Sequence, residues 1–457
     1  QLSYVGMNMQ EVAVKPVIKV LLQSDTQNLD EVVVTAMGIT RSEKTLGYSA
    51  TTVKADEIIS SRTTNVADAL SGKVAGLSVS STSSDPGSVS NIVIRGFSSI
   101  NGSNQPLYVV DGVPLQNNMV SGDGKNVSTG GISSVASEDI ASMTVLKGAA
   151  ATALYGSRAA NGVIVITTKS GKKGDGRNFS ISYSGNVQAR MVSFLPEMQN
   201  SFGQGWNGAQ TYIENGSWGP RLDGSMQVYG PIWNNQQLIH EYSAKKDNVK
   251  DFFDPGWSQN HTVSLSGVSA DTKMDYYLSY SFTKDDGIMP KDYDTYERNT
   301  VAFRGGYEAT NWLKVSSSLN FARSQTDAVG SFQGTSVIDG VFELPRDISI
   351  VDMKDTSSPF NTPEAYFTPY GITNPYWALE NNYNHTASKQ IYGKVQVDVT
   401  PIKELKLSYR MGFDYTDYDR KVGTPQINLD DALIDEDYGY APSNMNQSGH
   451  VYTRYGR

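Results

Sequence analysis

From residue 178 to the end of the chain, apolar and polar residues alternate with a period of two. The clearest stretch is 405–415, where Leu, Leu, Tyr, Met, Phe and Tyr alternate with Lys, Ser, Arg, Gly and Asp. Such alternation predicts a β-strand with one apolar face and one polar face. Eight runs of this kind lie near 178–191, 260–268, 273–284, 295–308, 312–323, 388–400, 405–418 and 447–457.

The segments between these runs alternate between long and short. Outer-membrane barrels have short turns on the periplasmic side and longer loops on the extracellular side, in the same alternation. A soluble sandwich would not usually place every long loop on one side. The pattern therefore predicts part of a membrane β-barrel. The segments are 192–259, 269–272, 285–294, 309–311, 324–387, 401–404 and 419–446.

Residues 41–173 show a different pattern, which predicts a compact mixed α/β unit. The stretch 65–74 places four apolar side chains on one face of a helix, and Gly76 is a typical helix stop. Apolar runs separated by turn-forming residues predict strands. The expected strands are 77–79, 92–95, 107–114, 143–147 and 162–168, with loops at 80–90 and 124–131 and a short helix at 149–154.

The size of this unit restricts the barrel that can hold it. About 130 residues in a compact domain have a radius of gyration of about 14 Å. The interior of an eight-stranded barrel is just filled by its own side chains. If the α/β unit lies inside the barrel, many more strands must follow residue 457, and large plugged transporters have about 22.

A short β-branched stretch precedes the α/β unit, Leu29-Asp30-Glu31-Val32-Val33-Val34-Thr35-Ala36. Three consecutive valines favour an extended backbone, and no partner strand is separated from them by a tight turn. One interpretation is an ordinary edge strand. The other is a docking strand that pairs with another protein by β-augmentation.

Composition restricts the function classes. A net charge of −9 and an isoelectric point near 5.1 argue against a nucleic-acid-binding protein, which usually presents a basic face. Without cysteine there is no disulfide framework and no thiolate zinc site. No apolar run is long enough for a transmembrane helix. Neither end resembles a natural terminus, which indicates a fragment of a larger protein.

Several motifs resemble those of a known family. The stretch 29–36 resembles a TonB box, and Ile94-Arg95-Gly96-Phe97, 106–114 and 145–164 resemble plug signatures. Residues 202–206 and 218–220 resemble the first barrel segment, and 2–22 the end of a carboxypeptidase-regulatory-like extension. The chain thus resembles the SusC-like (SusC/RagA) TonB-dependent outer-membrane transporters of Bacteroidetes. It differs from them in length, because roughly the last half of the barrel is missing.

The resemblance implies a membrane β-barrel of about 22 antiparallel strands when complete, with about the first eight in this chain. An N-terminal mixed α/β plug would lie inside the barrel. The implied location is the outer membrane of a Gram-negative bacterium. The implied domains are the end of the β-extension (1–24), the TonB box and its tether (25–40), the plug (41–173) and the first part of the barrel (174–457).

The implied function is import without covalent chemistry on the substrate, so no enzymatic activity, cofactor or metal is expected. The nutrient would be an oligosaccharide, as in most members, or a peptide. A SusD-like lipoprotein would cap the barrel, and the TonB–ExbB–ExbD complex would supply energy from the proton-motive force. The other implied partners are outer-membrane lipid and a second SusC–SusD pair in a dimer.

The resemblance and the residue types together single out three sites. The strand that binds TonB is Leu29, Asp30, Glu31, Val32, Val33, Val34, Thr35 and Ala36. Substrate contacts are expected at Ser99, Asn101, Asn104, Trp206 and Trp218. Plug-signature residues, expected at the contact between plug and barrel, are Arg95, Gly96, Asp111, Gly112, Lys147, Gly148, Tyr155, Gly156, Arg158, Asn161 and Gly162.

Several candidates have a plainer interpretation. The tryptophans of 192–259 could stack on sugar rings, but loop packing or contact with a lid is the favoured interpretation. Arg95 and Arg158 could pair with carboxylates on the barrel wall or bond within the plug. The acidic run 430–437 lacks the spacing of a calcium loop, which favours a solvated loop over a metal site. The four histidines, His240, His261, His385 and His450, are isolated in sequence.

Two other classes of function compete with import. A passive porin or an adhesin-type barrel would not need a plug with an energy-coupling strand. A soluble glycan hydrolase would need carboxylates gathered around one cleft, whereas Asp275, Asp398 and Asp414 are scattered along the chain. The sequence therefore favours an energised importer.

Overall fold

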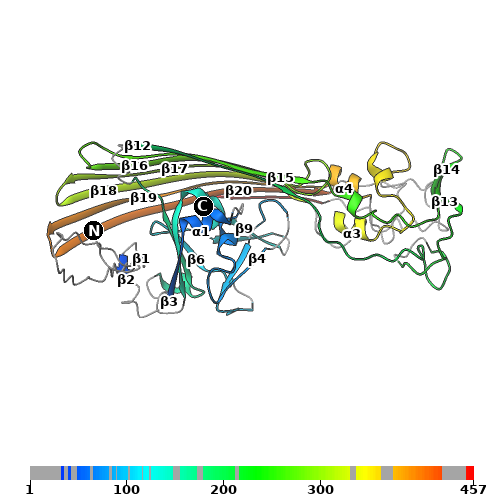
Figure 1. The fold of residues 1–457 in the computed structure, drawn as a ribbon, viewed down its shortest axis with the longest axis horizontal. Coiled ribbons are helices and arrows are strands. Elements are labelled where there is room, and N and C mark those ends of the chain that lie inside the picture. The colour runs from blue at the N-terminus through cyan, green and yellow to red at the C-terminus, as the bar shows by residue number, and fades with distance from the viewer. Residues whose placement is uncertain are drawn as a thin grey trace, which may run out of the picture.

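A computed structural model gives the fold of the chain (Figure 1). The expectations for 2–22, for a helix at 149–154 and for the acidic run 430–437 lie outside the residues that it describes. The described residues are 32–34, 40–42, 49–61, 65–81, 85–88, 90–100, 103–115, 117–122, 125–147, 155–171, 179–211, 216–329, 336–361, 374–424 and 449–456.

All eight alternating runs form strands, and these strands make one antiparallel sheet. The hydrogen-bonded order follows the chain, as the pattern of turns predicts. Figure 1 shows the sheet as a long curved wall with the α/β unit against one side. The strands are β12 (Phe179–Arg190), β15 (Gly256–Val268), β16 (Met274–Asp286), β17 (Thr295–Thr310), β18 (Leu313–Asp327), β19 (Tyr383–Ile402), β20 (Leu405–Thr424) and β21 (Gly449–Gly456).

The connections at the two ends of the wall differ in length. At one end, the strands are joined by residues 269–273, 311–312 and 403–404. At the other end, the connections are long and carry additional elements, which lie at the right of Figure 1. These elements are β13 (Met226–Trp233), β14 (Gln236–Glu241), η7 (Lys250–Phe252), α3 (Val337–Phe342), η8 (Val351–Lys354) and α4 (Pro375–Asn381).

The sequence pattern did not predict these elements of the long loops. β13 and β14 form a hairpin through Asn234 and Asn235, whose φ angles of 49° and 59° belong to a left-handed two-residue turn. Asparagine tolerates this conformation, so the turn needs no glycine. α3 and α4 pack in an apolar cluster that includes Val341 and Leu379. Among the described residues, no helix is long and apolar enough to cross a membrane.

The plug is built on a five-stranded sheet in the order β3-β10-β11-β6-β7. β11 and β6 are parallel, and the other neighbours are antiparallel. The sheet strands are β3 (Ser49–Lys54), β6 (Leu107–Val110), β7 (Val113–Pro114), β10 (Ile140–Lys147) and β11 (Val163–Thr168). Around them lie α1 (Ala55–Ser60), η3 (Val66–Leu70), β4 (Leu77–Ser81), β5 (Ser90–Ile94), β8 (Asn117–Gly122), β9 (Lys125–Gly130), η4 (Gly131–Ser134), η5 (Ser137–Asp139) and η6 (Gly156–Ala159).

Apolar side chains cover both faces of the plug sheet. Val145 and Ile164 belong to one buried cluster, and Leu146 and Val163 belong to another on the opposite face. Tyr392 of β19 enters the first cluster, so the wall contributes to the core of the plug. A sheet covered on both faces explains why its strands are continuous apolar runs rather than alternating ones.

Two expectations for the plug are corrected by the structure. The stretch 65–74 forms the short 3₁₀ helix η3, which ends at Leu70, and the chain then turns at Ser71, with a ψ of 128°, and at Gly72, with a φ of 72°. The four apolar residues are nevertheless buried, as the pattern requires. Residues expected as a loop at 124–131 include β9, which pairs with β8 in a hairpin.

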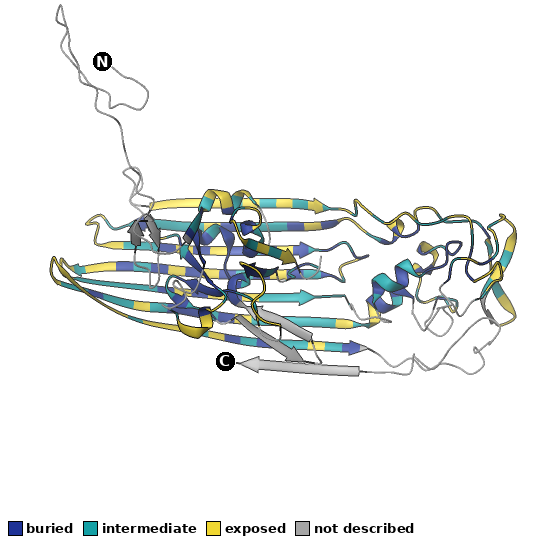
Figure 2. Cartoon of the chain, turned by 90° about the horizontal axis from the view of Figure 1, so that it is seen from below, coloured by how far each residue is buried: buried dark blue, intermediate teal, exposed yellow. Residues whose placement is uncertain are grey.

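The two faces of the wall have opposite chemistry. Along β20, six alternate residues from Leu405 to Tyr415 are apolar and 44–71% exposed, and Figure 2 shows this alternation of burial on neighbouring strands. Ten residue steps of about 3.4 Å on a strand tilted by about 40° give a band about 26 Å high. Outer-membrane barrels carry an apolar band of about 25 Å on their lipid face. We call this outward apolar surface the lipid belt.

Candidate functional site

The valine strand has a partner within the chain, which corrects the expectation that it has none. β1 (Val32–Val34) pairs antiparallel with β2 (Thr40–Ser42), with Val33 opposite Arg41. The connection 35–39 is too long for a tight turn but short enough for a hairpin. In the described part of the chain, the other edge of β1 has no neighbouring strand. Figure 1 places the pair at the end of the wall with the short turns.

The tight turn between β6 and β7 faces the barrel wall. Asp111 and Gly112 have φ angles of 48° and 84°, the left-handed geometry of a two-residue hairpin turn. The Asp111 carboxylate accepts hydrogen bonds from the Thr168 N–H at 3.0 Å and from its hydroxyl at 2.5 Å. These bonds attach the turn to the end of β11 and fix the position of the carboxylate.

On the wall, Arg304 of β17 faces two carboxylates of the plug. Its Nε lies 3.7 Å from Asp111 Oδ2, and its Nη2 lies 4.0 Å from Asp139 Oδ2. The guanidinium also lies over the ring of Tyr277, whose hydroxyl donates a 2.8 Å hydrogen bond to Asp139. Arg304 and Asp139 are 6% and 2% exposed. Loss of one partner from such a buried group leaves an uncompensated charge.

Other polar groups join the plug to the same strands of the wall. Lys394 of β19 donates a 2.7 Å hydrogen bond to the carbonyl oxygen of Asp111. Arg298 of β17 donates one of 2.7 Å to the carbonyl oxygen of Ser133. A Cβ atom on Gly112 would collide with the guanidinium of Arg410 on β20, so the turn approaches the wall closely. We call these residues, with Asp139, Tyr277 and Arg304, the plug–wall cluster.

The structure brings Asp111 and Gly112 into the plug–wall cluster, but not Arg95 and Arg158. Neither arginine forms an ion pair with a carboxylate among the described residues. Both side chains are exposed, Arg95 on the left-handed turn after β5 and Arg158 on η6. In the observed contact, the wall carries the cations and the plug carries the carboxylates.

The sequence patterns did not single out several members of this cluster. Arg298, Arg304 and Lys394 occupy polar positions of the alternating runs, which face the lumen. Other positions of this kind carry residues such as serine and asparagine. A large charged side chain among them could therefore have indicated a contact with the plug. Asp139 gave no signal, because it lies in the short η5 helix rather than in a motif.

Other plug-signature residues hold the plug itself together. Lys147 donates a 3.0 Å hydrogen bond to Thr51 on β3, and burial, aided by the charge of Arg95, lowers the pKa of Lys147. Tyr155 packs against the second buried cluster of the plug. Gly96 and Gly156 take positive φ angles at turns, and Gly148 lies outside the described residues.

Asn104 and Asn161 organise the loop that follows β5. The Asn104 side-chain oxygen accepts hydrogen bonds from the N–H groups of Ser98 and Ser99, both at 2.8 Å. Asn161 donates a 2.6 Å hydrogen bond to the carbonyl oxygen of Ser103. Beside it, a Cβ atom on Gly162 would press on Ile94 and on the backbone of β10.

These bonds have a consequence for the expected substrate residues of the plug. Ser99 and Asn104 shape their own loop, and they leave Phe97 and Ile100 as its exposed apolar side chains. Asn101 lies outside the described residues.

Trp206 and Trp218 belong to a folded segment of the first long loop. The ring of Trp218 lies 5.6 Å from that of Phe202. The indole of Trp206 covers Gly216, where a Cβ atom would collide with it. One face of each tryptophan is thus used in loop packing, and both side chains remain about half-exposed.

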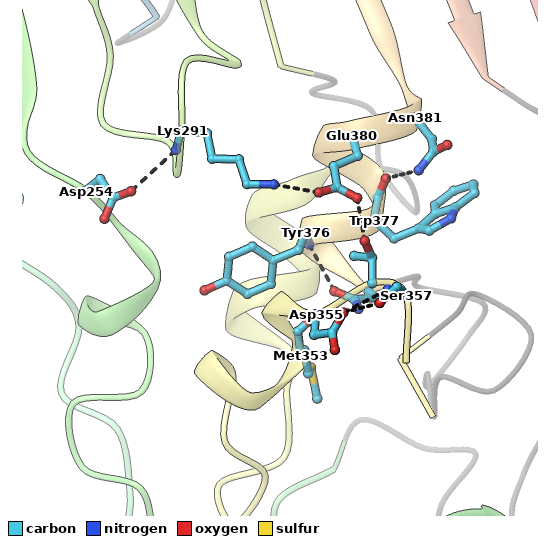
Figure 3. Close-up of polar contacts among 11 residues, drawn as sticks. Asp254, Lys291, Met353, Asp355, Ser357, Tyr376, Trp377, Glu380 and Asn381 are labelled. Atoms are coloured by element: carbon cyan, nitrogen blue, oxygen red, sulfur yellow. Dashed lines mark hydrogen bonds and ion pairs between the residues drawn. The ribbon is translucent and has the colours of Figure 1, made fainter. Parts of the chain in front are cut away.

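The long loops are joined to one another by polar contacts, which Figure 3 shows. Lys291, between β16 and β17, donates a 2.6 Å hydrogen bond to Glu380 of α4, and Thr356 donates one of 2.5 Å to the same carboxylate. Burial alone would raise the pKa of Glu380, but these hydrogen bonds outweigh it and lower the pKa. The bond to Glu380 raises the pKa of Lys291. The described parts of the long loops between β12 and β19 therefore form one packed platform at this end of the wall.

His240, His261 and His385 have separate partners. His240 lies 2.6 Å from Asp347, His385 lies 2.7 Å from Asp327, and His261 contacts the hydroxyl of Tyr183. Across the described ranges, no three metal-ligating side chains converge.

Comparisons with known proteins match this architecture. Residues 42–163 match the family described as TonB-dependent Receptor Plug Domain. The chain is 31% identical to TonB-dependent receptor SusC of Bacteroides thetaiotaomicron, over 91% of this chain and 40% of SusC. It is 28% identical to TonB-dependent receptor P39 of Formosa agariphila, over 94% of this chain and 38% of that receptor. The chain thus spans well under half the length of these relatives.

Solved structures show the same arrangement. A chain of the RagAB peptide importer in its open-open state superposes with a TM-score of 0.65 at 25% identity, over 88% of this chain and 44% of that one. The closed-closed state gives a TM-score of 0.61 at 22% identity, over 90% and 52%, which is a likeness of fold. With its plug and its lipid belt, the chain has the architecture of the SusC-like TonB-dependent receptors, outer-membrane proteins of Bacteroidetes, to which it is similar over nine-tenths of its own length.

Proposed function

We propose that this chain is the N-terminal part of a receptor that imports a large nutrient with energy supplied through TonB. The observation that supports the proposal is a plug bound to the inner face of the wall and preceded by the short strand β1. A plug inside the lumen blocks passive flow, so import requires a step that moves it. A passive porin or an adhesin-type barrel would have no use for this arrangement.

The backbone of β1 offers a docking edge for TonB. A strand can pair on two sides, and β2 takes one side in the described part of the chain. A strand of TonB would add to the other edge or displace β2. Several backbone hydrogen bonds of about 1 kcal/mol each would result. That strength suits a contact that forms and breaks during each transport cycle.

The plug sheet offers a path for the pulling force. The tether enters the sheet at β3, an edge strand whose only neighbour among the described strands is β10. The opposite edge carries the Asp111 turn, which Arg304 and Lys394 bind to the wall. One edge of the sheet would therefore receive the pull from TonB, while the other edge retains the plug in the barrel.

The partners and the nutrient belong to the same proposal. The family resemblance supports an oligosaccharide, and the likeness to the RagAB peptide importer supports a peptide as the second candidate. A SusD-like lipoprotein would cover the platform of long loops, TonB–ExbB–ExbD would supply energy, and two SusC–SusD pairs would form a dimer. The proposed domains are 1–24, 25–40, 41–173 and 174–457, in a barrel of about 22 strands.

A proline in β1 tests the docking assignment. Val33→Pro removes a backbone N–H and disfavours strand pairing. We expect nutrient uptake by cells to fall to the level of a strain without TonB, while nutrient binding at the cell surface is unchanged. Val33→Thr keeps both the N–H and the β-branched shape, so it should import normally. Normal uptake by the proline variant would disprove docking through β1.

A further inference from the structure

Two basic side chains lie directly opposite each other on neighbouring strands of the wall. Arg323 of β18 pairs in register with Lys389 of β19, and both side chains are exposed. Asn320 and Tyr392 of the same strands face the lumen, where they contact Arg304 and the plug core. Successive side chains alternate between the two faces of a strand. Arg323 and Lys389, each three residues away, therefore face the lipid.

The pair lies at the edge of the lipid belt nearest the long loops. Along β18, the belt begins at Leu313, and Phe321 is its last apolar outward residue before Arg323. The ten residue steps from Leu313 to Arg323 span about 26 Å along the membrane normal at a tilt of about 40°. The two charges therefore lie where acyl chains end and head groups begin.

The surroundings neutralise this pair only in part. Like charges directly opposite each other across two strands are unfavourable, because their Cβ atoms are only about 5 Å apart. Within the described ranges, neither Arg323 nor Lys389 forms an ion pair, and Arg323 has only a 3.4 Å contact with Gln325. These two residues belong to a row of outward neighbours that runs across β17 to β20. In this row Asn299 of β17 lies opposite Arg323, and Asp417 of β20 lies opposite Lys389. The row thus carries two positive charges and one negative charge.

Another outward lysine at the same edge is arranged differently. Lys284 of β16 lies directly opposite Glu297 of β17. Opposite charges across two strands stabilise the sheet. The Lys284–Glu297 pair therefore does not require an external anion. The repulsion between Arg323 and Lys389, in contrast, favours the binding of an external anion.

We propose that Arg323 and Lys389 bind the phosphate of a lipid head group in the outer leaflet. A guanidinium can donate two parallel hydrogen bonds to a phosphate, and the ammonium adds a compact charge. The long aliphatic stems of both residues let their charged ends reach the head-group level. An anion between the two cations would convert their repulsion into attraction.

The surface below the pair identifies the source of the phosphate as a lipid. Phe321 and Ile391 lie opposite each other one outward position closer to the centre of the belt. An acyl chain below the head group would cover these two side chains. Free phosphate in solution would gain nothing from them, so we assign the site to the lipid.

The test measures lipid binding to the full-length receptor in detergent by native mass spectrometry. Phosphatidic acid is the probe, diacylglycerol with the same acyl chains is the phosphate-free control, and inorganic phosphate is the free-anion competitor. Each basic group near an anionic surface contributes about 1 kcal/mol. We therefore expect the double variant Arg323→Gln/Lys389→Gln to bind phosphatidic acid about thirtyfold more weakly, from about 2 kcal/mol.

Two further variants separate a binding site from a structural effect. Lys284→Gln removes an outward lysine from the same edge and should bind phosphatidic acid as the unmodified receptor does. Arg323→Lys keeps a cation at the site and should retain most of the binding. Equal binding by the double variant, an equal loss in Lys284→Gln, equal binding of diacylglycerol or full competition by inorganic phosphate would each overturn the proposal.

Discussion

The plug sheet and the barrel wall are both β-sheets, but their side chains follow opposite rules. In the plug, Val163, Ile164, Val165 and Ile166 follow one another along β11 and are all 0–2% exposed. In the wall, apolar residues alternate with polar ones, and the apolar face is the exposed one. The buried face of the wall instead carries groups such as Arg304.

The surroundings of each sheet explain the difference. The plug sheet has protein on both faces, so both must be apolar. The wall has lipid on one face and the polar surface of the plug on the other. Lumen-facing arginines therefore need partners, and the plug supplies them through Asp111 and Asp139. A sheet of this kind has its apolar surface outside and its specific contacts inside, the reverse of a soluble domain.

Removal of the central cation of the plug–wall cluster should have the largest effect on this arrangement. Arg304→Met leaves the buried Asp139 and the partly buried Asp111 without this guanidinium, and we expect it to weaken the plug–wall contact by about 3–5 kcal/mol. The measurement is the urea concentration at which a protease cleaves the plug of the full-length receptor. Lys406→Met removes an exposed cation 3.5 Å from Asp398, whose carboxylate keeps its hydrogen bonds from Gln396 and Ser408, so it should change stability by only about 0–1 kcal/mol. An equal shift in both variants would contradict the buried cluster.

A charge in the middle of the lipid belt should have the next largest effect. Met411 lies near the centre of the belt on β20, and Met411→Arg should destabilise the barrel by about 2–4 kcal/mol. The measurement is urea-dependent unfolding of the full-length receptor in lipid vesicles. Ala387→Arg places the same charge on the outward face beyond the belt, opposite Asp419, and should change stability by about 0–1 kcal/mol. Equal effects would show that depth in the membrane is irrelevant.

The smallest expected effect comes from the removal of one methylene group, either from the plug sheet or from the wall. Ile166→Val in the plug core should cost about 1 kcal/mol, because the surrounding side chains cannot fill the space. Ile181→Val on the outward face of β12 should change stability by less than about 0.5 kcal/mol, because acyl chains fill the space instead. Urea titrations of the two variants in vesicles provide the comparison. A larger loss for Ile181→Val would indicate protein rather than lipid against β12.

Much of the wall could be predicted from residue order because each strand pairs with its neighbour in the chain. The alternation at 405–415 predicts a strand with lipid against one of its faces. Short connections such as 403–404 then require that strand to pair with the preceding one. The Asp111-Gly112 turn was also recognisable, since two adjacent left-handed residues suit this dipeptide. In contrast, the pairing of β1 with β2 left no local signal, because no tight turn joins them.

The sequence by itself determined the strands of the wall, their apolar face and the family, because periodicity and motifs are local properties. Only the tertiary structure decided which charges meet. Arg304 and Asp139 are 165 residues apart and belong to different sheets, so no spacing along the chain connects them. The repulsion between Arg323 and Lys389 likewise arises from strand register. Electrostatic contacts depend on distance in space, and that distance exists only after the plug and the wall have folded together.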